Sequence, residues 1–505
     1  MSKTRGHIAA GHSATAEAAA TILQEGGNAF DAAIAALLAS FVAEPCMSSA
    51  GGGAFLTAYR PDGVSFCYDC FVQTPRNKRP VDEIEFFPIE IDFGTAKEVF
   101  HIGMGSVAVP GTIAGIFKIH EDLGSMPMRE IAEPAIQLAK EGVVIDAFQD
   151  HDFHLLKDIL AVCKPSPVFW NGDHLISTGE TMYMPEFADC LDFIVREGQD
   201  EFYKGDIAKL ILKMNDERGG HLTAEDLAAY TVPRRQPLRV PYKDRSLLTN
   251  PLPSLGGSLI ALALQAFASQ GPVDFPIGST EEVARFAKVL SALDRLEKTP
   301  RNIAAALQRA FPNLPIPLQQ PNDAKLGGTS HFSILDEHGN AVSVTTSNGE
   351  GCGHFVPGTG IILNNMLGES ALLPNGLHSW APNTRLGSMM SPSILLDAHN
   401  QVEMVLGSGG AGRIPFMLAQ AIYKVVDQGA DIHEAVNSSR MHIIDGICNL
   451  EPGLPADAPM PAEVREVVAW EKQSLYFGGV HAVMRNGMDI DGQGDERRGG
   501  VDRQS

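Results

Sequence analysis

The segment from Gly327 to Gly353, GGTSHFSILDEHGNAVSVTTSNGEGCG, constrains the fold more than any other part of the sequence. Alternating side chains on both sides of EHGN predict two antiparallel strands joined by a turn centred near His338. Because the numbers of paired residues in a hairpin sum to twice its centre, Thr329 is expected to lie opposite Ser347. One face of this hairpin is then rich in hydroxyl groups, since side chains alternate between the faces of a strand: Thr329, Ser333, Ser343, Thr345 and Ser347.

The hydroxyl of Thr329 has a defined chemical use if it follows a cleaved bond. A threonine hydroxyl is a weak nucleophile, and an N-terminal threonine has a base in its own α-amine, which titrates near ~8. Gly327 and Gly328 allow backbone shapes that would bring the hydroxyl to the Gly328 carbonyl for an N-to-O acyl shift. Ser and Thr are also common in strands, so the pattern by itself fits an ordinary structural hairpin as well.

Helices are expected to dominate the first three-fifths of the chain. Residues Ser13 to Glu25 are Ala-rich and periodic, with Ser13 as the expected N-cap. Residues Asp31 to Val42 are apolar on most faces and predict a buried helix. A hairpin with a turn at Pro61-Asp62-Gly63 is expected next, and helical patterns recur up to Leu307.

Two segments lack a helical or strand pattern. PNLPIPLQQPNDAKLGG, immediately before Thr329, is rich in Pro, Gln and Asn and predicts an exposed linker. It is the best internal boundary, between a helix-rich part, residues 1–328, and a strand-rich part, residues 329–505. The final GMDIDGQGDERRGGVDRQS is polar and Gly-rich, and we expect it to be frayed or laid on the surface.

Composition narrows the possible partners. At 505 residues, the chain should form two lobes or one large layered domain, and its net charge of -22 argues against nucleic acid or anionic membrane as a partner. The 7 cysteines are odd in number and spread out, and Cys67-x-x-Cys70 lacks a second pair at zinc spacing, so we expect reduced thiols and no metal. No signal peptide or bilayer-length apolar run is evident, which favours a cytoplasmic location.

Several motifs resemble the γ-glutamyltransferase family of N-terminal nucleophile hydrolases, in that family's order and along almost the whole chain. They are EGGNAFDAAIAA, GGGAF, GSVAVPGTIAG, TSHFSILDEHGNAVSVTTS, GIILNNM, SMMSPSILL and GSGGAGRI. The resemblance implies an α+β fold, a four-layer αββα sandwich. It also implies that a large subunit, residues 1–328, and a small subunit, residues 329–505, arise from one precursor and form this sandwich jointly.

The resemblance assigns the chemistry to particular residues. Thr329 matches the processing site and nucleophile, with cleavage after Gly328. Ser347 matches the hydroxyl that positions the nucleophile, which is the pairing that the hairpin register predicts independently. Gly410 and Ala411 match the pair whose backbone N–H groups stabilise the tetrahedral oxyanion.

Substrate recognition follows the family only in part. Glu369 matches the acid that holds the donor α-ammonium, and Ser388 matches a serine for the donor carboxylate. Other positions depart from the usual residues: Phe71 stands where most members have an arginine for that carboxylate, Gly349 replaces Asn, Met366 replaces a polar residue and Met389 replaces a second serine. Arg76 and Arg79 follow Phe71, and we expect them to be surface charges.

The expected reaction is transfer or hydrolysis of γ-glutamyl groups from glutathione or similar amides, through a γ-glutamyl-Thr329 ester. The acceptor would be an amine, a peptide or water, and no cofactor is implied. Phe71 and Met366 make the pocket more apolar and leave open an acylase for another N-acyl amide, such as a β-lactam side chain. The short segment from Glu369 to Arg385 favours an open pocket. A third alternative is a member that no longer cleaves itself and serves binding or structure.

Overall fold

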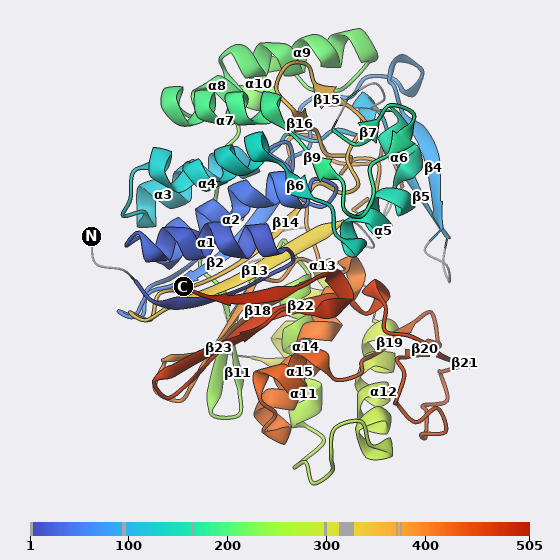
Figure 1. The fold of residues 1–505 in the computed structure, drawn as a ribbon. Coiled ribbons are helices and arrows are strands. Elements are labelled where there is room, and N and C mark those ends of the chain that lie inside the picture. The colour runs from blue at the N-terminus through green and yellow to red at the C-terminus, as the bar shows by residue number, and fades with distance from the viewer. Residues whose placement is uncertain are drawn as a thin grey trace.

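The computed structural model describes residues 4–92, 97–162, 166, 168–296, 300–312, 328–369, 372–373 and 376–505. Two antiparallel sheets lie face to face at the centre, and helices cover the outer side of each (Figure 1). This four-layer arrangement confirms the predicted αββα sandwich. Most of the expected linker before Thr329, residues 313–327, lies outside the described residues, as does Cys163.

The predicted hairpin lies at the centre of the first sheet. Its strands, β13 (Thr329–Asp336) and β14 (Ala341–Ser347), pair with Thr329 opposite Ser347, so the predicted register is confirmed. The sheet order is β10-β3-β2-β14-β13-β1-β24. The other strands are β10 (Arg234–Arg235), β3 (Ser65–Cys70), β2 (Gly53–Tyr59), β1 (Gly6–Ala10) and β24 (Val501–Gln504).

The second sheet has the order β11-β12-β17-β18-β22-β23. Its strands are β11 (Leu238–Tyr242), β12 (Arg245–Thr249), β17 (Ser393–Leu396), β18 (Val402–Gly409), β22 (Gly479–Asn486) and β23 (Asp489–Gln493). Each sheet therefore contains strands from both sides of Thr329. Residues 1–328 and 329–505 are interleaved and do not form separate lobes.

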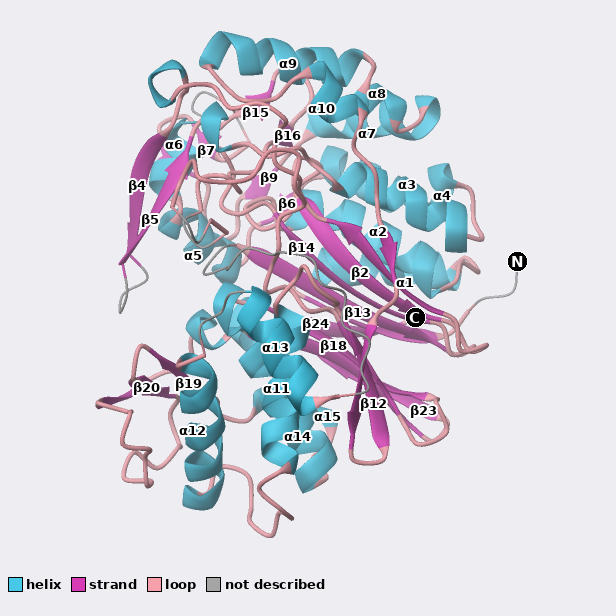
Figure 2. Cartoon of the chain, turned by 180° about the vertical axis from the view of Figure 1, so that it is seen from behind, coloured by secondary structure: helices cyan, strands magenta, loops and turns pink. Residues whose placement is uncertain are grey.

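The helical layers lie on opposite outer sides, as Figure 2 shows from behind. Over the first sheet, α2 (Ala29–Ala43) is buried along its whole length and begins with a capping box between Asn28 and Asp31. α1 (Ser13–Gln24) has His12 as its N-cap, so the prediction of Ser13 was wrong by one residue. α11 (Gly256–Ala268) and α14 (Ile414–Gln428) lie against the second sheet, with α12 (Thr280–Asp294) and α13 (Pro300–Ala310) beside them.

Smaller elements complete the two outer layers. The helices are α3 (Thr112–Leu123), α4 (Met128–Glu141), α5 (Ala147–Leu155), α6 (Lys157–Val162), α7 (Pro185–Glu197), α8 (Asp200–Tyr203), α9 (Asp206–Arg218), α10 (Ala224–Ala228) and α15 (Ile432–Asn437). The short strands are β4 (Phe87–Asp92), β5 (Lys97–Ile102), β6 (Val143–Val144), β7 (Trp170–Asn171), β8 (His174–Leu175), β9 (Thr181–Met182), β15 (Phe355–Val356), β16 (Ile361–Ile362), β19 (Met441–Ile444), β20 (Ile447–Leu450) and β21 (Glu466–Ala469).

The hydroxyl-rich face of the hairpin faces the second sheet. Ser343 Oγ donates to the Leu406 carbonyl at 2.9 Å and accepts from Ser393 N at 2.9 Å, so it joins strands of both sheets. His331 lies between Thr345 Oγ1 and Ser333 Oγ, at 2.9 Å from each. The alternate, apolar face packs in the core that contains α2: Phe332, Ile334, Val342 and Val344. The alternation in the sequence therefore separates a polar sheet–sheet interface from an apolar sheet–helix core.

The C-terminal segment, predicted to be frayed or laid on the surface, is not frayed: its last strand lies at an exposed sheet edge and the residues before it are partly buried. β24 pairs with β1 at the edge of the first sheet. Between β23 and β24, the fully buried Asp495 lies 2.7 Å from Arg440 Nη1 and 3.1 Å from Arg497 Nη1. Arg497 Nη2 also lies 2.6 Å from Glu451. A polar sequence therefore forms a buried ion network, which composition alone does not distinguish from a solvated tail.

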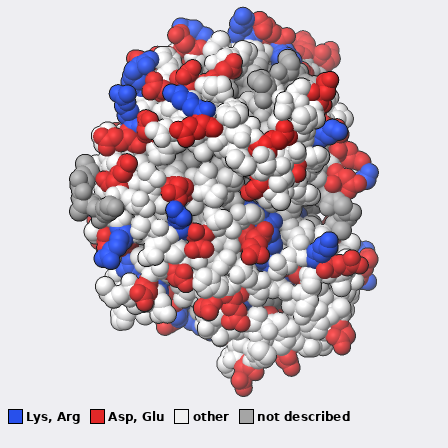
Figure 3. All heavy atoms as spheres, viewed as in Figure 1, with Lys and Arg blue, Asp and Glu red and all other residues white. Residues whose placement is uncertain are grey.

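Four features of the described residues concern possible membrane, redox, metal and charged partners. Among the described helices, none has both the length and the apolar character that a bilayer span requires. The six cysteines in the described part of the chain are buried, and burial raises the pKa of the Cys67 thiol to about 12. The described residues contain no group of three or more His, Cys, Asp or Glu side chains placed to hold a metal ion. Acidic and basic side chains are interspersed over the face shown in Figure 3.

Candidate active site

The peptide group before Thr329 is held at two points. Thr329 is 3% exposed and begins β13 opposite Ser347. Ser347 Oγ donates a hydrogen bond of 2.6 Å to the Gly328 carbonyl oxygen. On the other side, the Gly328 N–H donates to Glu350 Oε1 at 2.9 Å. The carbonyl that Thr329 would attack is thus fixed and polarised by a hydroxyl donor.

Glycine is required next to this bond by close approach of another backbone segment. A Cβ on Gly328 would lie 2.6 Å from the carbonyl oxygen of Gly349, closer than real Cβ contacts. Gly349 also donates its N–H to Ser347 Oγ at 3.1 Å. Because Ser347 Oγ accepts from this amide, its own proton is directed to the Gly328 carbonyl.

The carbonyl of Thr329 lies next to the end of β18 and to a buried arginine. Arg498 Nη1 lies 3.4 Å from the Thr329 oxygen. A Cβ on Gly409 would collide with the same oxygen, so the strand end approaches Thr329 closely. Burial lowers the pKa of Arg498 to about 10, so the guanidinium stays charged at neutral pH. The sequence does not mark Arg498 as a site residue, because Arg498 lies in the polar C-terminal segment, where no motif distinguishes it from a surface arginine.

Gly410 and Ala411 follow β18 and have left-handed backbones, with φ of 111° and 51°. For alanine this conformation costs about 1 kcal/mol or more. Within the described part of the chain, their N–H groups have no hydrogen-bond partner. Gly409, at the end of β18, approaches the Thr329 carbonyl closely. The N–H groups of the next two residues, Gly410 and Ala411, are therefore available beside Thr329. Such a turn can accept an oxyanion.

Glu369 lies in a buried acidic cluster beside Gly349. Its pKa is raised well above the usual range, first by burial and then by the carboxyls of Glu350 and Glu98. Burial likewise raises the pKa of Glu350 to about 8. A Cβ on Gly349 would lie 2.5 Å from Glu369 Oε1 and would also collide with Asn365 Oδ1. An asparagine, which the family commonly has at this position, would displace the ends of both side chains, so glycine at position 349 goes with their present placement.

The other donor positions are mostly apolar. Phe71 is buried and stacks on Phe55, with ring centroids 5.3 Å apart. Phe71, Met366 and Met389 belong to one continuous apolar core. Ser388 is 6% exposed, and its Oγ accepts from Met390 N at 3.1 Å within its own turn. The structure thus places Ser388 at the edge of an apolar region without a charged anchor for a carboxylate among these side chains.

A partly buried arginine that no sequence motif marks lies beside Phe71. Arg385 Nη1 donates to the Phe71 carbonyl and to the Tyr230 hydroxyl, and Nη2 donates to the Thr231 carbonyl at 2.6 Å. Arg385 Nε lies 3.8 Å from the Asp69 carboxylate. These contacts engage both terminal nitrogens, so Arg385 braces the strand end and does not replace the missing arginine.

The remaining candidate side chains have structural contacts. Arg76 pairs with Glu225 at 3.5 Å, and Arg79 pairs with Asp216 at 2.8 Å, as expected for surface charges.

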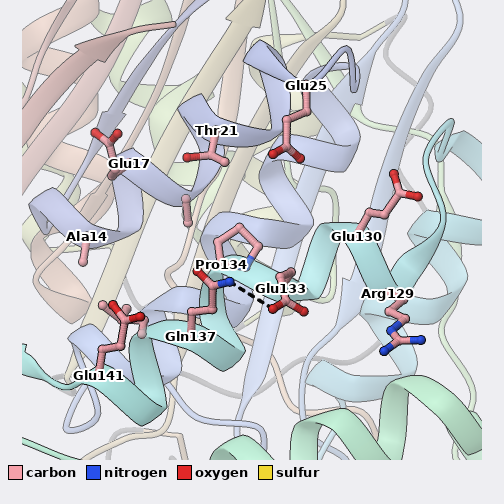
Figure 4. A pocket seen from close by; sticks show the side chains of 12 residues that line it. Ala14, Glu17, Thr21, Glu25, Arg129, Glu130, Glu133, Pro134, Gln137 and Glu141 are labelled. Atoms are coloured by element: carbon pink, nitrogen blue, oxygen red, sulfur yellow. Dashed lines mark hydrogen bonds between the residues drawn. The ribbon is translucent and has the colours of Figure 1, made fainter. Parts of the chain in front are cut away.

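Two cavities lie in the outer parts of the fold. One of about 490 Å³ is lined by α1 and α4, and Figure 4 shows Glu17, Glu133 and Glu141 around it. The other, of about 510 Å³, is lined by residues of α7 and β15, including Phe355. Neither is lined by a residue of the β13–β14 hairpin. These two cavities are therefore separate from the residues around Thr329.

An αββα sandwich whose central hairpin begins with a threonine, next to a carbonyl already bound by a hydroxyl, defines the class of N-terminal nucleophile hydrolases. Residues 15–291 and 279–504 match the family model for γ-glutamyltranspeptidase, and the chain belongs to this family. It is therefore an enzyme.

Named relatives cover nearly the whole chain. A glutathione hydrolase proenzyme of Pseudomonas aeruginosa is 30% identical, over 98% of this chain and 94% of the relative. The acylase ACY 1 proenzyme of Pseudomonas sp. (strain SE83) is also 30% identical, over 96% of this chain and 90% of the relative. The crystal structure of cephalosporin acylase from Bacillus halodurans has the same fold, with a TM-score of 0.80 at 22% identity, covering 99% of this chain and 96% of that one.

Proposed function

We propose that the chain cleaves itself between Gly328 and Thr329, and that the freed Thr329 then carries acyl groups as esters. The observation that supports this best is the 2.6 Å hydrogen bond from Ser347 Oγ to the Gly328 carbonyl. A donor at that oxygen stabilises the negative charge that develops when the Thr329 hydroxyl adds to the carbonyl carbon.

Cleavage proceeds by an N-to-O acyl shift. The bond from Thr329 Oγ to the Gly328 carbonyl carbon forms, the carbon–nitrogen bond breaks, and the hydroxyl proton ends on the released amine. Water then hydrolyses the ester, which leaves a carboxylate on Gly328 and a free Thr329. Residues 1–328 become the large subunit, and residues 329–505 become the small subunit.

In the mature enzyme, the α-amine of Thr329 takes the proton of its own hydroxyl as the hydroxyl attacks the donor amide. The N–H groups of Gly410 and Ala411 stabilise the tetrahedral oxyanion, and Ser347 orients the nucleophile. The amine of the donor leaves with the proton, and an acyl-Thr329 ester remains. An amine, a peptide or water then accepts the acyl group, and no cofactor takes part in this scheme.

The donor we propose is a γ-glutamyl amide such as glutathione. Glu369, a buried acid in the part of the sequence that binds the donor ammonium in the family, supports this choice, as does the similarity to glutathione hydrolase proenzymes. A second candidate is an acylase for another N-acyl amide, including β-lactam side chains. The buried, apolar Phe71, Met366 and Met389 favour it, together with the similarity to an acylase proenzyme. The cytoplasmic location expected from the sequence stays a prediction.

Donor trapping separates these candidates. The purified, cleaved enzyme is mixed with a γ-glutamyl anilide or with a glutaryl β-lactam, and the mass of the small subunit is recorded within the first turnovers. We expect an increase by one γ-glutamyl group on the peptide that begins with Thr329. An adduct formed only from the β-lactam compound would select the acylase, and a cleaved enzyme that forms neither adduct would contradict acyl transfer.

A further inference from the structure

We propose that Glu350 and Glu369 together form a two-carboxylate site that binds the ammonium group of the acyl donor after the precursor has been cleaved. The proposal rests on the proposed function, because it concerns the donor that forms the acyl-Thr329 ester. It assigns a specificity-determining role to Glu350.

In the precursor, the carboxylate of Glu350 is bound by the segment that will be cleaved. Glu350 is 5% exposed, and its Oε1 accepts the Gly328 N–H at 2.9 Å. Asn365 orients the residue, since its Oδ1 accepts from Glu350 N at 2.9 Å and its Nδ2 lies 3.5 Å from Glu350 Oε2. The carboxylate is therefore a fixed hydrogen-bond acceptor whose partner is the segment that cleavage releases.

The second carboxylate has an oxygen without a partner. Glu369 is 4% exposed, and its Oε1 makes no hydrogen bond within the described part of the chain. A buried carboxyl oxygen without a donor is costly, and such a group in a native fold calls for a ligand. Glu369 Oε1 lies 2.5 Å from where a Cβ on Gly349 would be, so glycine at position 349 lets this oxygen keep its place.

Cleavage adds a third acid, the new carboxylate of Gly328, beside Glu350 and Glu369. The new carboxylate on Gly328 forms next to an amide that lies 2.9 Å from Glu350 Oε1. Two ionised carboxylates repel each other strongly in a buried site, so the new chain end and Glu350 cannot both stay ionised there, which favours departure of the released end. The two acids that remain cannot both ionise in a buried site unless a cation joins them. A primary ammonium has three N–H donors and satisfies both carboxylates at once.

The geometry fits an amine on the third carbon after the acyl carbonyl. The acyl carbon of the donor takes the place of the Gly328 carbonyl carbon, because both become esters of Thr329 Oγ. The Gly328 nitrogen is two bonds from that carbon, and a γ-glutamyl ammonium is four bonds away. Two additional bonds extend a chain by about 2.4 Å. The ammonium therefore lies beyond the Gly328 nitrogen position, between Glu350 and Glu369.

Paired donors that differ only in the ammonium test the proposal. γ-Glutamyl and glutaryl p-nitroanilides are compared by kcat/KM for the cleaved wild type, Glu350→Gln and the control Glu337→Gln. Glutamine keeps an acceptor for the Gly328 N–H, so cleavage proceeds. Glu337→Gln removes the same charge from the turn of the same hairpin, where the carboxylate pairs with Arg5.

We expect the wild type and Glu337→Gln to prefer the γ-glutamyl donor, and Glu350→Gln to lose about tenfold of that preference. Equal preference in Glu350→Gln and wild type would overturn the proposal while leaving acyl transfer through Thr329 intact. A measurement without a variant is inhibition of the cleaved wild type by glutamate and by glutarate. We expect glutamate to bind at least about tenfold more tightly, and equal inhibition constants would also overturn the proposal.

Discussion

At the scale of single residues, the site depends on which atoms approach the Gly328–Thr329 bond. Ser347 Oγ donates to the Gly328 carbonyl at 2.6 Å and accepts from Gly349 N at 3.1 Å, so one hydroxyl links three parts of the site. The sequence predicts the Thr329–Ser347 pairing because strand periodicity fixes it. It does not predict Glu350 as a contact of Gly328, because that residue follows the strand in a turn whose path periodicity does not determine.

A test at this scale is Ser347→Ala, compared with Ser347→Thr. Loss of the hydroxyl should slow self-cleavage about 100-fold, the effect of removing one oxyanion donor, whereas threonine retains the donor and should cleave at a rate close to that of the wild type. The measurement is the half-time for conversion of freshly folded precursor, followed by denaturing electrophoresis. Cleavage of Ser347→Ala at the wild-type rate would exclude a role for this hydrogen bond.

At the scale of elements, the hairpin, the buried α2 and the β2–β3 hairpin follow from periodicity and turn residues. The segment after β22 could not be predicted in this way. Its strands are short, and it is stabilised by buried ions, with Arg497 paired to both Glu451 and Asp495. Charged residues next to glycines are typical of exposed tails, and only the fold reveals their partners. For the same reason, the sequence does not indicate that Arg498 lies beside Thr329.

The prediction for this segment is that Arg497→Met destabilises the protein by about 3 kcal/mol, because it leaves the buried Glu451 without its arginine partner and Asp495 with Arg440 alone. Arg503→Met is the matched control, since Arg503 pairs with Glu17 at 2.8 Å while both side chains are about half exposed. It should change stability by less than about 1 kcal/mol. Urea denaturation followed by circular dichroism compares the two variants. Equal midpoints would contradict the role of the buried network.

At the scale of the whole molecule, both sheets combine strands from residues 1–328 with strands from residues 329–505. β13 and β14 lie between β2 and β1 in the first sheet, and β12 pairs with β17 in the second. Both central sheets of the fold therefore need both parts. The resemblance to a known family implies this joint sandwich, whereas composition alone leaves two lobes open.

This interleaving predicts that the two pieces stay together after cleavage. They should elute as one species in size-exclusion chromatography under native conditions and separate only in denaturant, because separation would break the strand pairs that join them and expose buried sheet surface to water. Elution of the pieces as two folded species would contradict the shared sheets.

The central claim is self-cleavage at Thr329, and the intact mass of the purified protein tests it most directly. Wild type and Thr329→Ala are measured side by side, with N-terminal sequencing of any smaller fragment. We expect two pieces from the wild type, the smaller beginning Thr-Ser-His-Phe, and a single uncleaved chain from Thr329→Ala. A folded wild type that stays whole would contradict the account and favour a binding or structural role for this family member.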